Sequence, residues 1–286
     1  MTGGGVFLNR LLTISNCQSI NDFVTCTVEG CSYIATSKDD IIMPRMFVQR
    51  INWANKEIKR FYELTKQYYN VDDSKGYFLD LGANIGTTGI YFLKKFTPNL
   101  KLLAFEPDPT NFKLHRLNLI LNDMESMATV VNYGLGNESI DLPLQRSLTN
   151  PGGNSIVRKD IKGLTEIIKV IPLDIYIAKN KIDAQEVKYI WIDTEGFEAQ
   201  VLLGSKDLLK VNPLPIFMEF NLKAWDNSGC FEDMMTLLAE SYSHFIHMYR
   251  GKEVLYPLET LRTFERPNNP LGQIGDIFLI KKGTIA

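Results

Sequence analysis

Residues 78–89 read "FLDLGANIGTTG", and this stretch decides the fold. Its apolar start ends in an acid, Asp80, and Gly82 and Gly86 then permit a tight turn with close backbone approach. A helix-forming sequence follows, and the N–H groups of a first helical turn are free to bind polar groups. The stretch therefore predicts a strand, a ligand-binding turn and a helix, in that order.

The alternation of apolar strands and helices continues towards the C-terminus. Continuous apolar strands separated by helices are typical of a parallel sheet that is covered on both faces. The last two strands have no clear helix between them, which favours an antiparallel closing strand. We therefore expect an α/β fold with a Rossmann-like, doubly wound, seven-stranded, mostly parallel sheet. The predicted strands span residues 76–82, 101–107, 128–136, 187–193, 214–220, 244–250 and 275–282, and the clearest helices span 85–96, 109–123, 196–209 and 230–242.

Residues 1–70 differ in pattern and are predicted to form an N-terminal, partly helical extension of the α/β domain, which spans 71–286. The extension reads as irregular up to about Pro44 and as a helix after it. In that helix the apolar residues recur at a spacing that places them on one face. They are Phe47, Ile51, Ile58, Phe61 and Leu64.

Composition and charge exclude several classes of partner. The 286 residues carry a net charge of −2 and no dense basic run, so we expect no binding to nucleic acid. No apolar stretch approaches the ~20 residues that a membrane-spanning helix needs. The four cysteines form no CxxC pair and the start of the chain lacks the pattern of a signal peptide. We therefore expect reduced thiols and a cytoplasmic protein.

Four acids stand at or near the C-terminal ends of predicted strands: Asp80, Glu106, Asp193 and Glu219. In parallel α/β sheets, ligands bind in the crevice outside these strand ends. Burying like charges together is costly, so the acids are expected to face that crevice rather than the core.

The glycine spacing discriminates between two nucleotide cofactors. A dinucleotide fingerprint needs G-x-G-x-x-G, whereas this turn has Asn84 where the second glycine would fall. Asp80 would repel a pyrophosphate but suits the ammonium group at the amino-acid end of S-adenosylmethionine. Glu106 can accept hydrogen bonds from the ribose hydroxyls of either nucleotide. We predict S-adenosylmethionine as the cofactor, bound by Asp80, Gly82, Ala83, Asn84, Gly86, Glu106 and Asp193.

From about residue 40 to 281 the chain resembles the FkbM-type methyltransferases. The resemblance implies the class I methyltransferase fold for residues 71–286, S-adenosylmethionine as methyl donor, and hydroxyl groups of sugars or secondary metabolites as acceptors. Thr194 and the pair Thr87 and Thr88 depart from the residues that are common in the family. The matching stretches are "FLDLGANIGTTG" (78–89), "AFEPDPTNF" (104–112), "VIPLDIYI" (170–177), "YIWIDTEGFEAQVLLGS" (189–205) and "PIFMEF" (215–220).

Methyl transfer to a hydroxyl group needs an oriented acceptor and a base, and a positioned base typically contributes about 10²–10⁴-fold. The resemblance places the methyl-transfer site at Asp193, and Glu195 follows in the turn. We predict these two acids as base and acceptor-binding group. Glu198 falls in the first turn of the next helix, where the helix dipole stabilises an acid. The three acids could also hold Mg²⁺ or Mn²⁺, but no histidine is near them in the sequence and we expect no resident metal.

Two further residues are expected to meet the acceptor. Glu219 ends the fifth strand, and Asn154 lies in "TNPGGNS" (149–155), a polar loop near the expected mouth of the crevice. Asp174 is expected to cap the start of its own helix.

The sequence therefore favours an S-adenosylmethionine-dependent methyltransferase that methylates a hydroxyl of a sugar, a glycan or a secondary metabolite. Its expected partner is that small-molecule or glycan acceptor. A nicotinamide-dependent oxidoreductase is one alternative, although the glycine spacing and a proton donor for it are missing. A non-catalytic binding module that keeps the cofactor fold is another.

Overall fold

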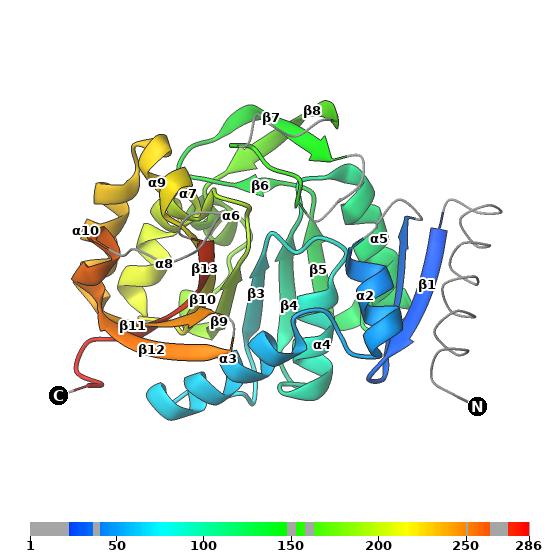
Figure 1. Cartoon of the computed structure of the whole chain (residues 1–286), viewed down its shortest axis with the longest axis horizontal. Coiled ribbons are helices and arrows are strands. Elements are labelled where there is room, and N and C mark those ends of the chain that lie inside the picture. Colours follow the sequence, from blue (N-terminus) through cyan, green and yellow to red (C-terminus); the bar gives the residue numbers. More distant parts are fainter. Residues whose placement is uncertain are drawn as a thin grey trace.

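The computed structural model describes residues 23–36, 41–147, 153–157, 163–249, 251–263 and 274–285. An eight-stranded sheet runs through the middle of the molecule (Figure 1). Neighbouring strands from one edge to beyond the centre are parallel, as buried apolar strands favour. In spatial order these strands are β5 (Ala128–Val131), β4 (Lys101–Phe105), β3 (Tyr77–Leu81), β9 (Val187–Ile192) and β10 (Ile216–Asn221).

The other side of the sheet contains the last strands of the chain. β13 (Ile274–Lys281) lies antiparallel between β10 and β11 (Tyr242–Tyr249), which confirms the antiparallel closing strand predicted from the sequence. β12 (Lys252–Pro257) pairs with β11 and forms the edge. The α/β class and the mostly parallel sheet are confirmed, with one strand more than the seven expected. β12 was missed because its mostly exposed, partly charged sequence lacks the pattern of a buried strand.

Helices cover both faces of the sheet, as expected for a doubly wound fold (Figure 1). On one face α3 (Asn55–Tyr68) and α4 (Thr87–Lys95) pack through Phe61 and Phe92, and α5 (Pro109–Ile120) lies beside them. The opposite face carries α6 (Leu173–Lys179), α7 (Glu198–Leu203), α8 (Lys206–Val211), α9 (Leu222–Ser228) and α10 (Phe231–Ser241). Short 3₁₀ helices are η1 (Glu125–Met127), η3 (Ala184–Glu186) and η4 (Leu258–Arg262).

None of the helices in the described ranges is long and apolar enough to cross a membrane.

Two of the predicted helices are each divided. The helix expected over 196–209 breaks between α7 and α8 at Gly204, where a Cβ atom would lie 1.9 Å from the carbonyl oxygen of Gly136. The N-terminal helix divides into α2 (Ile42–Gln49) and α3, because Arg50 and Ala54 adopt left-handed backbone conformations with φ of 57° and 52°. The spacing of apolar residues, on which these helices were predicted, does not reveal close backbone contacts or left-handed turns.

A β-hairpin precedes α2, so the expectation of irregular structure up to Pro44 is wrong for residues 23–36. Its strands are β1 (Phe23–Val28) and β2 (Cys31–Thr36). Cys26 and Cys31 of this hairpin are buried free thiols. Asn118 of α5 accepts a hydrogen bond from the Ile34 N–H at 2.7 Å and so ties the hairpin to the main domain.

The predicted strand 128–136 divides between two sheets. β5 belongs to the main sheet, whereas β6 (Gly134–Leu135) joins a three-stranded sheet with β8 (Gly163–Ile171) and β7 (Ile140–Ser147). In Figure 1 this small sheet lies across one end of the main sheet. We call β7, β8 and residues 153–157 the flap.

An aromatic cluster holds the central strands against α3. The fully buried ring of Phe61 has its centroid 5.8 Å from the centroids of Trp191 in β9 and Phe217 in β10. Trp191 and Phe217 stack with centroids 4.0 Å apart. Such pairs contribute about 0.5–1.5 kcal/mol beyond area burial. The strands are thus fixed just before the acids at their C-terminal ends.

Candidate functional site

Two cavities lie at the C-terminal ends of the central strands. We call the first the inner pocket; it has a volume of about 60 Å³ and is formed by the ends of β3, β4 and β9 together with the flap. Six residues predicted as site residues line it: Gly82, Asn84, Glu106, Asn154, Asp193 and Glu195.

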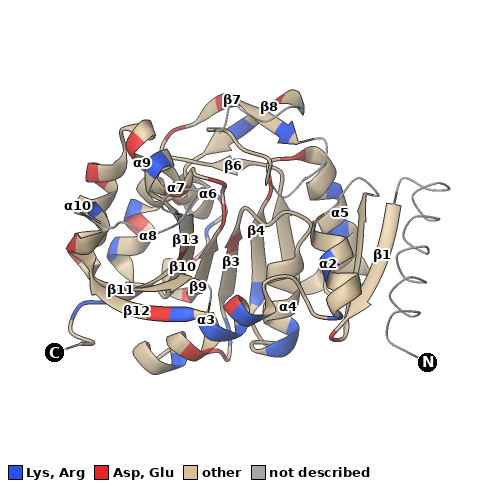
Figure 2. Cartoon of the chain, in the orientation of Figure 1, with Lys and Arg blue, Asp and Glu red and all other residues tan. Residues whose placement is uncertain are grey.

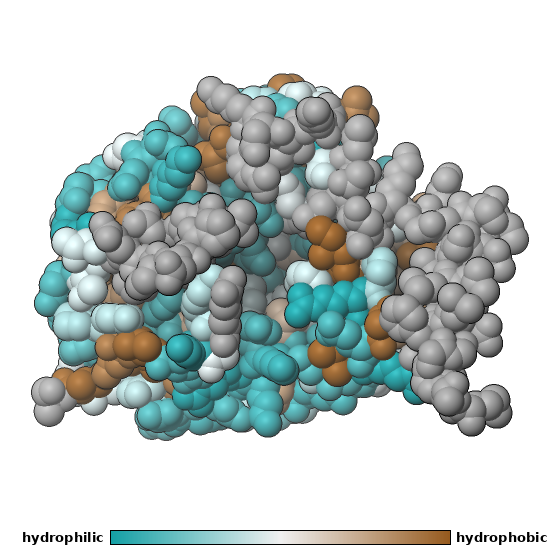
Figure 3. Space-filling model, in the orientation of Figure 1, coloured by the Kyte–Doolittle hydropathy of each residue, from teal (hydrophilic) through white to brown (hydrophobic). Residues whose placement is uncertain are grey.

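The second cavity, which we call the outer cleft, has a volume of about 810 Å³. It lies between the N-terminal helices and the ends of β10, β13, β11 and β12, and it contains Glu219. Figure 3 shows a hollow near the middle of this face of the molecule, bordered largely by hydrophilic residues. The two predicted acceptor residues, Glu219 and Asn154, therefore line different cavities.

The glycine turn after β3 is held by backbone contacts. The N–H groups of Gly82 and Ala83 donate to the Phe105 carbonyl at 3.0 and 2.9 Å. Gly82 has a φ of +91°, and a Cβ atom there would lie 1.8 Å from the carbonyl oxygen of Asp193. The position requires glycine because the turn passes directly against the loop after β9.

Two further residues of the turn carry unusual features. Asn84 has a φ of +48°, and its buried Oδ1 has no hydrogen-bond partner within the described part of the chain. A Cβ atom at Gly86 would lie 2.3 Å from the ring of His115, a fully buried residue of α5. Burial lowers the pKa of His115 to about 3, so its imidazole is neutral. His115 was missed because nothing in the sequence links α5 to this turn.

Asp80 lies behind the turn and does not line the inner pocket. Its carboxylate accepts a hydrogen bond from the Gly89 N–H at 2.9 Å, in the first turn of α4. The residue is 1% exposed, and burial raises its pKa to about 7. Asp80 therefore supports the turn from behind and does not itself line the inner pocket.

Glu106, at the end of β4, does line the inner pocket. Its two carboxylate oxygens accept hydrogen bonds from the N–H groups of Asn84 at 2.7 Å and Asp108 at 2.8 Å. Burial raises the pKa of Glu106 to about 8, although both N–H groups act in the opposite direction. Each oxygen keeps a further lone pair, so the carboxylate can accept additional hydrogen bonds.

The loop after β9 carries the two predicted catalytic acids. Asp193 is reached by solvent within a concave site but is surrounded by protein, and this burial, with the nearby Glu198 charge, raises its pKa to about 7. Glu195 lines the same pocket and has a φ of +54°. A left-handed conformation costs a non-glycine residue about 1–3 kcal/mol and is typical of functional sites.

Glu198 has a larger structural role than a helix dipole would give it. It is fully buried, and one carboxylate oxygen accepts from the Thr194 N–H, the Thr194 hydroxyl and the Gly196 N–H, each at 3.0 Å. The other oxygen accepts from the indole N–H of Trp225 at 2.9 Å. Glu198 does start α7 as predicted, but it fixes the loop that precedes the helix.

A row of acids crosses the sheet at the level where the strands end. β9 and β10 pair with Ile192 beside Met218, so Asp193 and Glu219 follow at one level. Glu219 in turn lies opposite Asp276 of β13. Oε2 of Glu219 is buried without a hydrogen-bond partner among the residues described, and burial, with the neighbouring carboxylates, raises its pKa well above the usual range.

The wall of the outer cleft carries both signs of charge. Arg60 of α3 binds Glu253 of β12 through two hydrogen bonds of 2.7 and 2.8 Å. The Arg45 guanidinium lies 5.1 Å from the ring centroid of Trp53. Figure 2 shows both charges where α3 and β12 meet. The cleft thus offers hydrogen-bonding groups and one aromatic ring, a composition that suits a polar ligand.

Asp174 does not cap its own helix, contrary to the sequence-based expectation. Pro172 precedes α6 as its cap residue, and the Asp174 carboxylate accepts from the N–H groups of Asp207 and Leu208 at 2.9 and 3.0 Å. It therefore caps α8, which lies beside it in space. In the described residues, no group of three or more His, Cys, Asp and Glu side chains is placed to hold a metal ion.

The inner pocket also contains residues that sequence reasoning missed. Phe105, Tyr133, Leu144, Ile156 and Phe197 give it an apolar wall. Tyr133 lies within the predicted strand 128–136; it was missed because β5 ends earlier, at Val131, which places Tyr133 beyond the end of that strand. Leu144 and Ile156 belong to the flap, and no local sequence pattern predicts where the flap packs relative to the main sheet.

Known proteins resemble this chain in sequence. A family model of the methyltransferase FkbM domain matches residues 80–249, more than half of the chain. Methyltransferase sdnD of Sordaria araneosa is 36% identical over 93 residues, and Methyltransferase 1 of Beauveria bassiana (strain ARSEF 2860) is 28% identical over 156 residues. The alignments cover 32% and 48% of this chain but only 36% and 60% of those two proteins.

Solved structures resemble it more distantly. The FkbM methyltransferase of Methylobacillus flagellatus has 14% identity and a TM-score of 0.45, over 96% of this chain and 60% of that one. The tRNA (uracil-54, C5)-methyltransferase of Pyrococcus abyssi, in complex with S-adenosyl-L-homocysteine, has 9% identity and a TM-score of 0.41, over 91% and 44% of the two chains. Scores of this size carry no inference about activity.

The family match agrees with the cofactor predicted from the turn after β3, S-adenosylmethionine, and does not support the nicotinamide alternative. It covers the end of β3 and all of β4 and β9, the strands whose ends form the inner pocket. The chain therefore belongs to the FkbM methyltransferase family.

Proposed function

We propose that this protein transfers a methyl group from S-adenosylmethionine to a hydroxyl oxygen of a sugar, a glycan or a hydroxylated secondary metabolite. The observation that carries the proposal is the neighbouring pair Asp193 and Glu219. Asp193 lines the inner pocket, Glu219 lines the outer cleft, and the two acids stand at one level on adjacent strands. A donor and an acceptor held in the two cavities would meet at this pair.

The residues of the inner pocket fit the donor. The Oδ1 of Asn84, which has no partner among the described residues, and the spare lone pairs of Glu106 can accept hydrogen bonds from its ammonium and hydroxyl groups. Phe105, Tyr133 and Leu144 offer an apolar wall for its base. S-adenosylmethionine supplies a methyl group on a positively charged sulfur, which an oxygen nucleophile can attack.

In this proposal Glu219 and Asp193 have different roles toward the acceptor. Glu219 would hold the acceptor by hydrogen bonding from the floor of the outer cleft, through the oxygen that has no partner in the described residues. Asp193 would take the proton of the acceptor hydroxyl as the oxygen–carbon bond forms. A base with a pKa near 7 is well matched to neutral pH, because half of it is deprotonated there. Glu195 supports the pocket wall beside it.

The outer cleft supports a polar acceptor of substantial size. Its volume of about 810 Å³ exceeds the space a simple alcohol needs and lies in the range of about 300–1,000 Å³ that is typical of ligand sites. Its arginines, carboxylates and Trp53 suit a compound with many hydroxyl groups. A fully apolar acceptor would leave these groups without partners.

The proposal is tested in two stages. A thermal-shift titration with S-adenosyl-L-homocysteine should raise the unfolding midpoint by several degrees, since a ligand at 100 times its Kd adds about 2.7 kcal/mol. Transfer of an isotope-labelled methyl group to a panel of sugars and polyhydroxylated metabolites should then yield an ether, with the labelled carbon on oxygen by NMR.

The variant Asp193→Asn should bind S-adenosyl-L-homocysteine as the wild type does and lose about 100-fold or more in turnover. Absence of a thermal shift would overturn the donor assignment. A label found on nitrogen or carbon would overturn the acceptor class, and a near-normal rate in Asp193→Asn would remove this residue as the base.

A further inference from the structure

The flap forms one wall of the inner pocket. Leu144 of β7 and Asn154 and Ile156 of the flap line the pocket opposite Glu106 and Asn84. The remaining volume is about 60 Å³, whereas ligand sites typically span about 300–1,000 Å³. A nucleoside therefore needs more room than this volume offers, and movement of the flap away from the strand ends would provide it.

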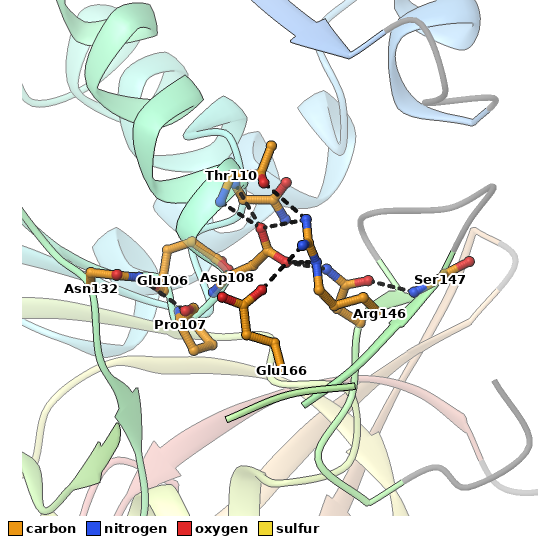
Figure 4. Close-up of polar contacts among 10 residues, drawn as sticks. Glu106, Pro107, Asp108, Thr110, Asn132, Arg146, Ser147 and Glu166 are labelled. Carbon is orange, nitrogen blue, oxygen red and sulfur yellow. Dashed lines mark hydrogen bonds and ion pairs between the residues drawn. The ribbon is translucent and has the colours of Figure 1, made fainter. Parts of the chain in front are cut away.

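The flap contacts the main domain through an apolar cluster around Phe197, through a hydrogen bond from the Ser155 hydroxyl to the Glu195 carbonyl at 2.9 Å, and through an ion pair. Asp108 follows β4 and is fully buried, and its Oδ2 lies 2.5 Å from Nε of Arg146 in β7 (Figure 4). The Nη2 of Arg146 also donates to the Thr110 hydroxyl at 2.9 Å, and its Nη1 donates to Glu166 of β8 at 3.1 Å. Arg146 thus joins both strands of the flap to the start of α5.

The same aspartate is tied to the cofactor side of the site. Its N–H donates to Glu106 at 2.8 Å, and its Oδ1 caps α5 by accepting from the Thr110 and Asn111 N–H groups at 2.8 and 3.0 Å. Its Oδ2 also accepts from the Asn154 amide at 3.2 Å. Asp108 therefore contacts the acid of the inner pocket and two separate parts of the flap.

We propose that the Arg146–Asp108 pair is a latch that holds the flap closed over the nucleoside site, and that it must open for the methyl donor to enter and leave. Arg146 is a positioning residue in this account, because it acts through the flap and through Asp108. Its planar guanidinium makes several charge-assisted hydrogen bonds at once, which gives the closed flap one defined position. The inference rests on the proposed function of the inner pocket as the donor site.

The latch predicts a kinetic effect that a purely structural role does not. Loss of the pair lowers the barrier to opening for entry and for exit alike. In Arg146→Ala, the association and dissociation rate constants for S-adenosyl-L-homocysteine should both rise about tenfold, while Kd changes by less than either rate. Arg146→Lys, which keeps the charge but loses the fork of donors, should give intermediate rates.

The experiment is stopped-flow binding of S-adenosyl-L-homocysteine to the full chain. Glu166→Gln serves as a second variant, because it weakens the exposed side of the latch and leaves the buried Asp108 with its partner Arg146. This variant should raise both the association and the dissociation rate constant by about threefold. Arg60→Ala is the matched control, since it breaks an ion pair of similar geometry, with Glu253, at the outer cleft. Its rates should equal those of the wild type.

Unchanged association rates in folded Arg146→Ala and Glu166→Gln, or an equal rise in Arg60→Ala, would overturn the latch while leaving the donor site in place. Failure of the wild type to bind S-adenosyl-L-homocysteine would overturn the proposed function and the latch with it.

Discussion

The inner pocket and the outer cleft lie on either side of one pair of acids and are built in different ways. The inner pocket is made by backbone segments in direct contact, such as Gly82 against the Asp193 carbonyl, and the fully buried Glu198 fixes the loop that carries Asp193. The outer cleft is more than ten times larger and is walled by exposed side chains, including the pair Arg60 and Glu253.

Because they are built differently, the two cavities should respond differently to mutation. The parallel strands that form the fold also form the inner pocket, so we expect a change there to affect stability together with binding of the proposed donor. The outer cleft is formed by α2, α3 and the β11–β12 hairpin together with the ends of β10 and β13, and its wall includes exposed side chains such as Arg45 and Lys252. A change there should affect the acceptor and leave the fold intact.

The largest expected effect comes from Gly82→Ala. The new Cβ atom would lie 1.8 Å from the Asp193 carbonyl oxygen in a left-handed backbone conformation, so the turn must shift. We expect a loss of about 4 kcal/mol in the free energy of unfolding, together with loss of S-adenosyl-L-homocysteine binding. Urea denaturation measures the first quantity.

Gly251→Ala is the matched control at the outer cleft. Gly251 also has a positive φ, of +74°, but a Cβ atom there would meet no atom within 4 Å. Its cost should be about 1 kcal/mol, the backbone term alone. Equal costs for the two variants would remove the contrast between a tightly built and an open site.

A somewhat smaller effect is expected for Glu198→Ala. Removing the carboxylate leaves the buried donors of Thr194, Gly196 and Trp225 without their acceptor. We expect a loss of about 3 kcal/mol and a less ordered loop around Asp193. In Glu253→Ala, which breaks an exposed ion pair, the loss should stay below about 1 kcal/mol. A loss in Glu198→Ala as small as that in Glu253→Ala would show that the loop does not depend on Glu198.

The pH dependence of stability probes the buried acids of the inner site. Burial raises the pKa of Asp80 to about 7 and that of Glu106 to about 8, so the folded chain keeps these protons to higher pH than the unfolded chain does. Their contribution to stability is fully present below the unfolded values near 4 and is lost as the pH rises through about 7 to 8. Other groups being equal, the ligand-free protein loses stability over this window.

Asp80→Asn should therefore flatten this part of the profile and raise the unfolding midpoint at pH 8. Thermal unfolding between pH 5 and pH 8.5 measures it. A slope identical to that of the wild type would mean that Asp80 is already ionised in the folded state over this range, so that its pKa is not raised.

The smallest expected effect on the fold belongs to Arg45→Ala at the outer cleft. Its guanidinium lies over Trp53 at the surface of the cavity, so stability should change by less than about 1 kcal/mol. Binding of S-adenosyl-L-homocysteine should be unchanged, and turnover of the acceptor should fall through a higher KM. A weakened donor affinity would indicate that the two cavities are not independent.

Much of this architecture follows from local sequence patterns. Apolar runs ending in acids predicted the central parallel strands, and the glycines before α4 predicted the turn beside Glu106. Contacts between distant residues could not be predicted in this way. Asp174 caps α8 across space, and Arg146 reaches Asp108 from another sheet. The left-handed Arg50 and Ala54 divided a helix whose periodicity read as continuous.

The candidate site shows the same limit. Asp193, Glu195 and Glu106 were predicted to lie together because they follow strands, and strand ends meet at one edge of a parallel sheet; all three line the inner pocket. Asp80 also follows this pattern, yet it lies behind the turn because its side chain bonds the start of α4. The outer cleft could not be predicted, because the sequence pattern indicates neither the edge strand β12 nor the break between α2 and α3.

The most direct test of the two-cavity account is isothermal titration of S-adenosyl-L-homocysteine into wild type, Glu106→Gln and Glu219→Gln. Glu106 lines the inner pocket and Glu219 the outer cleft, so the two substitutions make the same chemical change on opposite sides of the acidic pair. We predict at least tenfold weaker binding for Glu106→Gln and unchanged binding for Glu219→Gln. Equal affinities for the two variants, or weaker binding in Glu219→Gln, would contradict the assignment of donor and acceptor to these cavities.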